Sequence, residues 1–179
     1  MRFELQPVLI GDVIELRPLR QDDFTTLYDV ASDPLIWEQH PEPDRCTEPV
    51  FRVFFREAIE SGGAFAVLDR VDGRLIGSSR FARYDEANRE IEIGWTFLAR
   101  SHWGGTYNRE MKRLMLAHAF RFVDRVVFRV GPLNRRSQRA LEKIGASSLG
   151  LQPHPVSGHA MVYEITRDTF FGVRPRNHE

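Results

Sequence analysis

Apolar and polar residues in the first third of the chain change from a strand pattern to a helical one. Residues 13–19 carry β-forming side chains and predict a short strand, and residues 20–32 then place apolar side chains at helical spacing. A second amphipathic helix is predicted over 47–61, where Thr47 is a candidate N-cap and Gly62-Gly63 ends the apolar stripe. The first third therefore predicts one strand followed by two helices.

The hydrophobic period changes to two in the middle of the chain. Residues 64–69 and 75–84 flank the turn at Asp72-Gly73, and residues 90–98 form a third segment of this kind, so three consecutive antiparallel strands are predicted. Strict alternation in the third strand defines two faces, one with Ile91, Ile93, Trp95 and Phe97 and the other with Glu90, Glu92, Gly94 and Thr96.

The second half alternates helices with strands. A helix that starts at Tyr107 and ends near Val123 is apolar on most sides from Leu114 onward, which predicts that it is buried. The remaining predicted elements are a strand at 125–130, a helix at 134–144 closed by Gly145, strands at 147–151 and 158–165, and a short helix at 167–173. The pattern predicts one α+β domain, residues 13–173, with a mixed central sheet of six to seven strands flanked by helices. Residues 1–12 are expected to form an N-terminal extension and residues 174–179 a tail.

Composition narrows the function classes. The chain has 179 residues, 42% of them hydrophobic, and 25 basic residues balance 25 acidic ones. A formal charge of zero gives no general attraction to nucleic acid or to an anionic membrane. The single cysteine, Cys46, excludes an internal disulfide framework, and the six histidines show no metal-ligand spacing, so no metal is expected. The longest apolar run, Ala64 to Leu68, is too short to span a membrane, and the first residues lack a signal-peptide layout, so a cytoplasmic protein is expected.

A glycine pair precedes the predicted buried helix. Gly104-Gly105 leaves the first amides of that helix beside a loop with little side-chain bulk, and a helix N-terminus of this kind attracts phosphate. The glycines would equally serve to turn the chain away from the sheet. Neither common nucleotide-binding motif, G-x-x-x-x-G-K-[ST] or G-x-G-x-x-G, is present.

The predicted helix at 134–144 places one hydroxyl on its inward stripe. Ser137 falls in line with Ala140, Leu141 and Ile144, and a hydroxyl on such a face needs a partner. Local structure also accounts for the polar residues here, because Asn134 is a natural N-cap.

Several short motifs then follow one another in a recognisable order. They are Leu16-Arg17-Pro18-Leu19, Asp22-Asp23-Phe24, Ser32-Asp33-Pro34, Glu92-Ile93-Gly94-Trp95, Trp103 to Glu110, Asn134-x-x-Ser137 and Leu141 to Gly145. In this order the chain resembles the GCN5-related N-acetyltransferase (GNAT) superfamily, in its ribosomal-protein-alanine acetyltransferase-like branch. The superfamily loop usually reads Q/R-x-x-G-x-G/A, whereas this chain has Ser101 in the first position and Thr106 in the last, with Arg100 one residue early.

The resemblance implies transfer of an acetyl group from acetyl-CoA to a primary amine, either a protein N-terminus or a small molecule. It also implies a splay between two strands that forms the acetyl-CoA cleft. The residues it assigns to the coenzyme are Trp103, Gly104, Gly105, Thr106, Tyr107 and Asn108 around the pyrophosphate, Asn134 on the pantetheine chain, and the backbone amides of Phe97 and Leu98 at the thioester oxygen.

The resemblance also implies catalytic and acceptor residues. Glu92 is the expected general base, with Glu90 as the alternative on the same strand face. Ser137 is the expected proton donor to the departing thiolate, and Tyr84 or Tyr107 would substitute for it. An acceptor pocket is expected between residues 37–40 and residues 153–159, with Trp37 and Tyr84 contacting the amine.

Two other functions remain open at this point. The atypical loop suits a non-catalytic acyl-CoA sensor or partner-binding domain. The arginines at 135, 136 and 139 suggest nucleic-acid binding, which the neutral charge disfavours. The expected partners are acetyl-CoA and an amine acceptor, with no nucleic acid and no membrane, and the protein is expected to be a monomer or homodimer.

Overall fold

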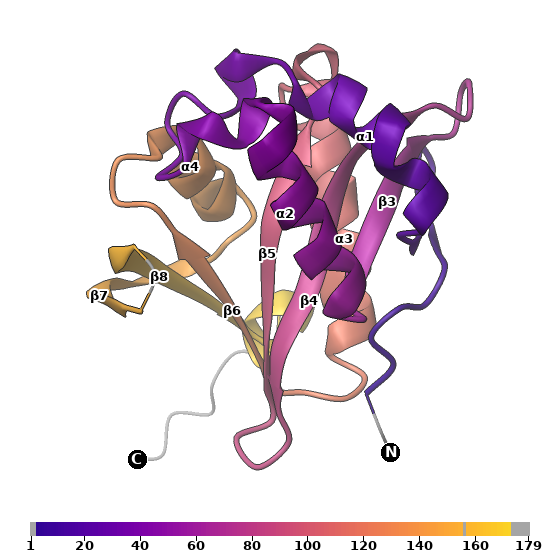
Figure 1. Ribbon diagram of the computed structural model, residues 1–179. Coiled ribbons are helices and arrows are strands. Elements are labelled where there is room, and N and C mark those ends of the chain that lie inside the picture. The colour runs from indigo at the N-terminus through magenta and orange to yellow at the C-terminus, as the bar shows by residue number, and fades with distance from the viewer. Residues whose placement is uncertain (1–2, 156, 173–179) are drawn as a thin grey trace, which may run out of the picture.

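The computed structural model describes residues 3–155 and 157–172, which fold around a single mixed sheet (Figure 1). The sheet has eight strands in the order β1-β2-β3-β4-β5-β6-β8-β7, one or two more than predicted. The strands are β1 (Leu9–Ile10), β2 (Ile14–Pro18), β3 (Ala64–Asp69), β4 (Leu75–Asp85), β5 (Glu90–Leu98), β6 (Arg125–Val130), β7 (Ser147–His154) and β8 (Gly158–Thr166). The α-helices are α1 (Phe24–Ala31), α2 (Glu48–Glu60), α3 (Thr106–Ala119), α4 (Arg135–Lys143) and α5 (Arg167–Phe171). Short 3₁₀ helices are η1 (Gln21–Asp23), η2 (Pro34–Ile36), η3 (Pro43–Cys46) and η4 (Arg100–His102).

Helices cover both faces of the sheet and create two cores. Helices α1 and α2 lie across the front face in Figure 1, and α3 packs behind it. The α3 side buries Met111 and Met115 against strand residues such as Ile91. The α1–α2 side buries Phe51 and Phe55 among other aromatic rings. Each face of the sheet thus carries apolar side chains, which fixes the sheet between two helical layers.

Most predicted elements are present, with local differences at their ends. Residues 3–12, expected to extend from the domain, supply β1 to the sheet edge, and Phe3 is buried in the α3-side core. Helix α3 ends at Ala119, four residues earlier than predicted, because the chain turns there while its apolar side chains stay buried. Thr47 occupies the N-cap position of α2, but its hydroxyl donates to the Asp44 carbonyl instead of accepting from the helix. The predicted tail, residues 174–179, lies outside the described residues.

The predicted alternation along β5 is wrong beyond Ile93. Strand β4 pairs Ser78 with Phe97 but Arg80 with Gly94, so β5 carries one extra residue between these pairs. The bulge is at Trp95, whose φ is +50°. Ile91 and Ile93 face the α3-side core, whereas Trp95 and Phe97 pack on the α1–α2 side. A bulge therefore reverses the faces halfway along the strand.

Strands β5 and β6 part from one another after Glu92, just before the bulge. They pair in parallel only at Glu90–Arg125, Ile91–Val126 and Glu92–Val127. Strand β6 continues to Val130 on β8 instead, and β5 continues to Leu98 on β4. Residues 93–98 of β5 and 128–130 of β6 therefore enclose a gap in the sheet, which we call the fork.

One carboxylate joins the far edge of the sheet to α3. Glu110 of α3 accepts hydrogen bonds from the backbone N–H groups of Asp12, Val13 and Ile14, at 2.7, 2.8 and 3.0 Å. Its carboxyl carbon also lies 2.5 Å from where a side chain at Gly11 would begin, so a larger residue at that position would displace the carboxylate. The β1–β2 turn is therefore held by a side chain from about a hundred residues further along the chain.

Among residues 3–155 and 157–172, no helix has the length and apolar character needed to cross a membrane.

Candidate active site

The loop from Trp103 to Asn108, called here the phosphate loop, joins the end of β5 to α3. Gly104 and Gly105 have φ values of +107° and +118°, a conformation that side chains rarely adopt. A Cβ at either position would meet no atom within 4 Å, so the backbone is open on that side. Among the described residues, no side chain caps the N-terminus of α3. The first amides of this 14-residue helix are thus without a side-chain partner, which is the arrangement in which a helix N-terminus accommodates an anion.

Asp69, at the end of β3, joins the two ends of this loop. Its Oδ2 lies 3.1 Å from Nε2 of His102 and accepts a 3.1 Å hydrogen bond from the hydroxyl of Tyr107. The two rings meet edge to face with centroids 4.6 Å apart. Hydrogen bonds from the Val71 backbone and then from these two side chains lower the pKa of Asp69, and the same contact raises the pKa of Tyr107. His102 is half-buried and supports the loop through this contact.

Trp103 connects the loop to the fork and to α4. Its indole N–H donates to the Leu98 carbonyl at 3.0 Å, and the Arg136 guanidinium lies 4.0 Å from its ring centroid. Arg136 also donates to the Ile36 carbonyl at 2.7 Å. The first turn of α4 is therefore held near both the phosphate loop and the loop after α1.

The Leu98 carbonyl shows which strand edge faces the fork. The Ala99 N–H donates to the Ile76 carbonyl, so the backbone of Ala99 points toward β4. Backbone groups of successive strand residues point to opposite edges, so the amide of Leu98 points to the fork and that of Phe97 points to β4. Of the two amides expected at the thioester oxygen, only that of Leu98 therefore lies on the fork edge. The ring of Phe97 is buried against Trp37, with centroids 5.0 Å apart.

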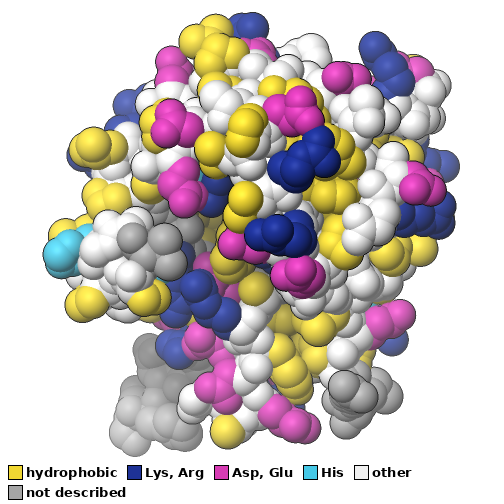
Figure 2. Space-filling model, in the orientation of Figure 1, with side chains coloured by type: hydrophobic (Ala, Val, Ile, Leu, Met, Phe, Trp, Pro, Cys, Tyr) yellow, Lys and Arg dark blue, Asp and Glu magenta, His cyan; other side chains and the backbone are white. Residues whose placement is uncertain are grey.

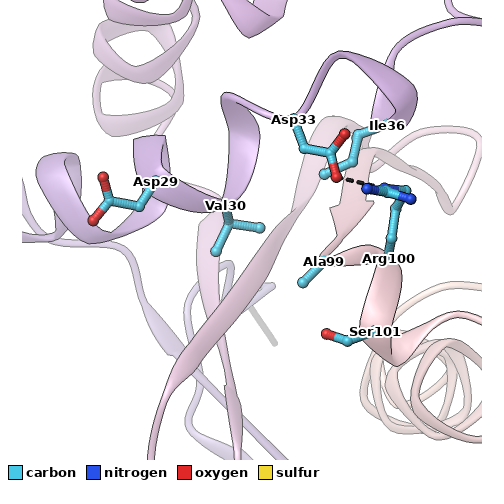
Figure 3. Close-up of a pocket in the computed structure, with 7 residues that line it drawn as sticks. All are labelled: Asp29, Val30, Asp33, Ile36, Ala99, Arg100 and Ser101. Atoms are coloured by element: carbon cyan, nitrogen blue, oxygen red, sulfur yellow. Dashed lines mark hydrogen bonds and ion pairs between the residues drawn. The ribbon is translucent and has the colours of Figure 1, made fainter.

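A hollow of about 520 Å³ lies between the end of α1 and η4 (Figure 3). Ser101 lines it, and at its rim Arg100 forms an ion pair with Asp33, which is drawn as the dashed line in Figure 3. Arg100, the basic residue nearest the start of the loop, is thus engaged by the segment after α1. The groups that the phosphate loop presents to an anion are accordingly backbone amides.

Glu92 is buried on the α1–α2 side of the fork, with 4% of its surface exposed. Its Oε2 accepts from Arg83 of β4 and, at 2.6 Å, from Arg129 of β6. Among the described residues Oε1 has no hydrogen-bond partner, and it lies 3.5 Å from where a side chain at Gly94 would begin. Glycine at that position leaves space over the free oxygen. Glu90, the alternative base, forms an ion pair with Arg125 of β6.

The predicted residues of α4 serve its first turn. Asn134 is buried and its Oδ1 accepts the Ser137 N–H at 3.1 Å, which is the predicted N-cap. The Ser137 hydroxyl has no hydrogen-bond partner among the described residues and is half-buried. Gln138 takes the buried position that the helical pattern gave to Ser137, and its amide donates to the carbonyls of Gly131 and Pro132.

The two residues expected to contact the amine lie elsewhere. Trp37 is 3% exposed, and its indole N–H donates to the Ala31 carbonyl at 2.7 Å, so it is a core residue. Tyr84 packs against Phe3 at the other end of β4, with ring centroids 5.2 Å apart. Tyr84 therefore lies away from the fork, and Trp37 meets it only through the buried ring of Phe97.

The segments expected to form the acceptor pocket do meet. Residues 38–41, residues 131–133 and Ser157 line a hollow of about 190 Å³. His40 lies in its wall, and burial together with the nearby Arg45 lowers the pKa of His40 to about 3. Val156, within the expected 153–159 segment, lies outside the described residues.

Lys112 was missed by the sequence reasoning. It lies on α3 with 5% of its surface exposed, and its Nζ donates to the Thr96 hydroxyl at 2.7 Å. Helical spacing offers a signal for it, because Lys112 falls on the same stripe as the buried Met115 and Ala119. Within the described part of the chain, no group of three or more His, Cys, Asp or Glu side chains is placed to hold a metal ion.

Comparison with known proteins places this geometry in a family. Residues 14–147 match the family model described as "Acetyltransferase (GNAT) domain". The chain belongs to the GNAT acetyltransferases. The expected resemblance is thus confirmed, and the protein is an acyltransferase of a family that uses acetyl-CoA. No curated protein sequence gives a significant match.

Solved structures agree on the fold. A GCN5-related N-acetyltransferase from Brucella melitensis has a TM-score of 0.81 at 21% identity, over 97% of this chain and 88% of that one. An acetyltransferase of the GNAT family from Bacillus anthracis has a TM-score of 0.74 at 21% identity, over 89% and 98%. Mycobacterium smegmatis RimJ in complex with CoA-disulfide has a TM-score of 0.69 at 21% identity, over 90% and 85%. At these identities the likeness establishes the GNAT fold.

Proposed function

We propose that this GNAT domain acetylates a primary amine, a protein N-terminus or a small molecule, by direct attack of the amine on acetyl-CoA. The observation that carries the proposal is the continuity of two features. The phosphate loop offers uncapped amides at the N-terminus of α3, and its Trp103 is hydrogen-bonded to the edge of the fork. A diphosphate on the loop and a thioester between the parted strands suit one extended ligand.

Glu92 is the proposed base. A primary amine is mostly protonated near neutral pH, so attack needs a group that removes a proton. The two arginines bind one carboxylate oxygen and hold the side chain still, while Oε1, beside Gly94, has no partner in residues 3–155 and 157–172. In this arrangement the free oxygen receives the proton, directly or through one water molecule.

The other proposed groups act on the thioester. The Leu98 amide, on the fork edge, donates to the carbonyl oxygen as negative charge develops there. The Ser137 hydroxyl, which has no hydrogen-bond partner in the described part of the chain, donates to the departing sulfur. Asn134 retains its side-chain N–H groups for the pantetheine chain, because the cap uses only Oδ1.

A thiol-release assay with acetyl-CoA and a panel of primary amines, run beside calorimetric titration of CoA, tests the proposal. Turnover with at least one amine is expected, and Glu92→Gln should reduce it by on the order of 10²- to 10⁴-fold with CoA affinity unchanged. Glu90→Gln is the matched control, because that carboxylate pairs with Arg125 on the same strand face.

Binding of CoA without turnover on any amine would instead indicate the sensor function. Nucleic-acid binding has little support, because basic and acidic side chains are intermixed over the face shown in Figure 2.

A further inference from the structure

Lys112 is a buried cation without an anionic partner among the described residues. Helix α3 directs it at the sheet, and its Nζ donates to Thr96 at 2.7 Å. An ammonium group carries three N–H donors, and the described residues supply one acceptor, a neutral hydroxyl. Buried charges in proteins are normally paired, because leaving water is costly for an ion. This arrangement therefore needs an explanation beyond packing.

The ammonium lies between the two strands of the fork. Thr96 belongs to β5 and follows the bulge at Trp95, and the Lys112 Nζ is 5.6 Å from the ring centroid of Phe128 on β6. Both strand residues lie beyond Glu92–Val127, the last pair that joins β5 to β6. Lys112 thus occupies the place where the sheet opens.

Among the described residues, no charged side chain forms an ion pair with it. Its hydrogen-bond partner, the Thr96 hydroxyl, is itself 2.8 Å from the Ser79 hydroxyl, and the Phe128 ring lies beside the ammonium. Burial alone lowers the pKa of Lys112 to about 7. The carboxylate of Glu92 lies on the other face of the sheet, where Arg83 and Arg129 hold it.

We propose that Lys112 is a catalytic residue that pairs its ammonium with the CoA thiolate as acetyl transfer proceeds. The inference rests on the proposed function. The amine nitrogen forms a bond to the acetyl carbon, the carbon–sulfur bond breaks, and its electron pair leaves on sulfur beside the Lys112 ammonium. The proton lost by the amine passes through Glu92 to solvent, and the sulfur, which accepts a hydrogen bond from Ser137, regains a proton from solvent on release.

The charge of Lys112 makes sulfur a better leaving group. A cation within about 4–6 Å lowers the pKa of an acid by about 1 to 3. The same interaction favours the protonated form of Lys112 when the thiolate is present, so the pair is most stable as ammonium and thiolate. In the absence of the ligand, the lowered pKa of Lys112 allows the amine to lose its proton, which limits the cost of burying it in the core.

Titration of bound CoA tests the pairing without an acceptor amine. The ultraviolet absorbance of the thiolate, followed against pH, gives the pKa of the CoA thiol on the protein. In the unmodified protein this pKa should lie about 1 to 3 below that of free CoA. Lys112→Met should return it to the free value or above, and Lys112→Arg, which keeps the charge, should keep it low.

The chain supplies its own matched control. Lys143, the only other lysine, lies exposed at the end of α4, so Lys143→Met should leave the thiol pKa and the turnover unchanged. With an active amine, Lys112→Met should lower kcat by about 10-fold or more with little change in KM for acetyl-CoA, and Lys112→Arg should restore most of it.

Three results would overturn the inference. A bound thiol with the pKa of free CoA in the unmodified protein excludes the pairing even if the variants fail to fold. The pairing is also excluded if the bound CoA thiol has the same pKa on Lys112→Met as on the unmodified protein. Acetylation of Lys112 by acetyl-CoA, detected by mass spectrometry, would make it a nucleophile instead. Failure of CoA to bind at all would be a different result, because it refutes the proposed function itself.

Discussion

The backbone of the phosphate loop allows a sharp test at Gly105. This residue is the N-cap of α3, with φ +118° and ψ −37°, and a Cβ there would meet no atom within 4 Å. Gly105→Ala therefore adds no steric clash, and its whole penalty comes from the dihedral angles. Holding a non-glycine residue in such a region costs about 1 to 3 kcal/mol.

That free energy must emerge in one of two measurable quantities. If the loop keeps its shape, the free energy of unfolding falls by about 1 to 3 kcal/mol. If the loop relaxes, its amides move away from the diphosphate, and CoA binding weakens by about 5- to 150-fold, the same energy expressed as affinity. Chemical denaturation and calorimetric titration with CoA together account for both.

Gly62→Ala separates loop strain from glycine replacement in general. Gly62 also has a positive φ, +62°, and open space around it. It lies between the end of α2 and the start of β3, whereas Asp69, which contacts the phosphate loop, is the last residue of β3. Gly62→Ala should lose stability by about 1 kcal/mol with CoA affinity unchanged. If Gly105→Ala changes neither stability nor CoA affinity, the argument that the loop depends on this backbone geometry is refuted.

Three further predictions concern single side chains. Ser137→Ala should change the free energy of unfolding by no more than about 0.5 kcal/mol, because the Ser137 hydroxyl has no partner among the described residues. Turnover in the thiol-release assay should fall, and normal turnover would remove Ser137 from the mechanism. Tyr107→Phe removes the hydrogen bond to Asp69 and should weaken CoA binding by the equivalent of about 0.5 to 1.5 kcal/mol. Tyr28→Phe removes a hydrogen bond to the Cys46 carbonyl and should leave CoA binding unchanged. Equal CoA affinities for the two variants would contradict the role of Tyr107 in supporting the loop. Because burial and Arg45 lower the pKa of His40 to about 3, the unfolded chain binds a proton there from about pH 6.5 downward and the folded chain does not, so this group reduces stability as pH falls from 6.5 to 3. Denaturation of His40→Gln should show a shallower loss of stability over that range, and an unchanged slope would contradict the assignment.

Local pattern was sufficient to predict most of the fold. Strand β5 and strand β6 begin and end where the hydrophobic pattern placed them, and the Asp72-Gly73 turn joins β3 to β4. These elements are set by residues close in sequence, through alternation and turn chemistry. Strand β1 was missed because two residues carry no periodic signal.

The site was less accessible to such reasoning because it depends on distant residues. No residue type marks the bulge at Trp95 in the sequence, so the reversal of the strand faces there could not be predicted from alternation. The arginines that hold Glu92 come from β4 and β6, and Asp69 reaches His102 from 33 positions away. Lys112 was predictable from its helical stripe, but the position of its ammonium in the fork follows only from the packing of α3.

The grip of Glu110 on the β1–β2 turn has a consequence for how the protein is made. Synthesis delivers Asp12 to Ile14 first, and the carboxylate that satisfies their N–H groups comes 96 to 98 residues later. At about 5–20 residues per second, the ribosome needs roughly 5 to 20 seconds to produce that partner. Until then the N–H groups of the β1–β2 turn have no Glu110 carboxylate to donate to. The β1–β2 hairpin should therefore be among the last parts to become protected from hydrogen exchange.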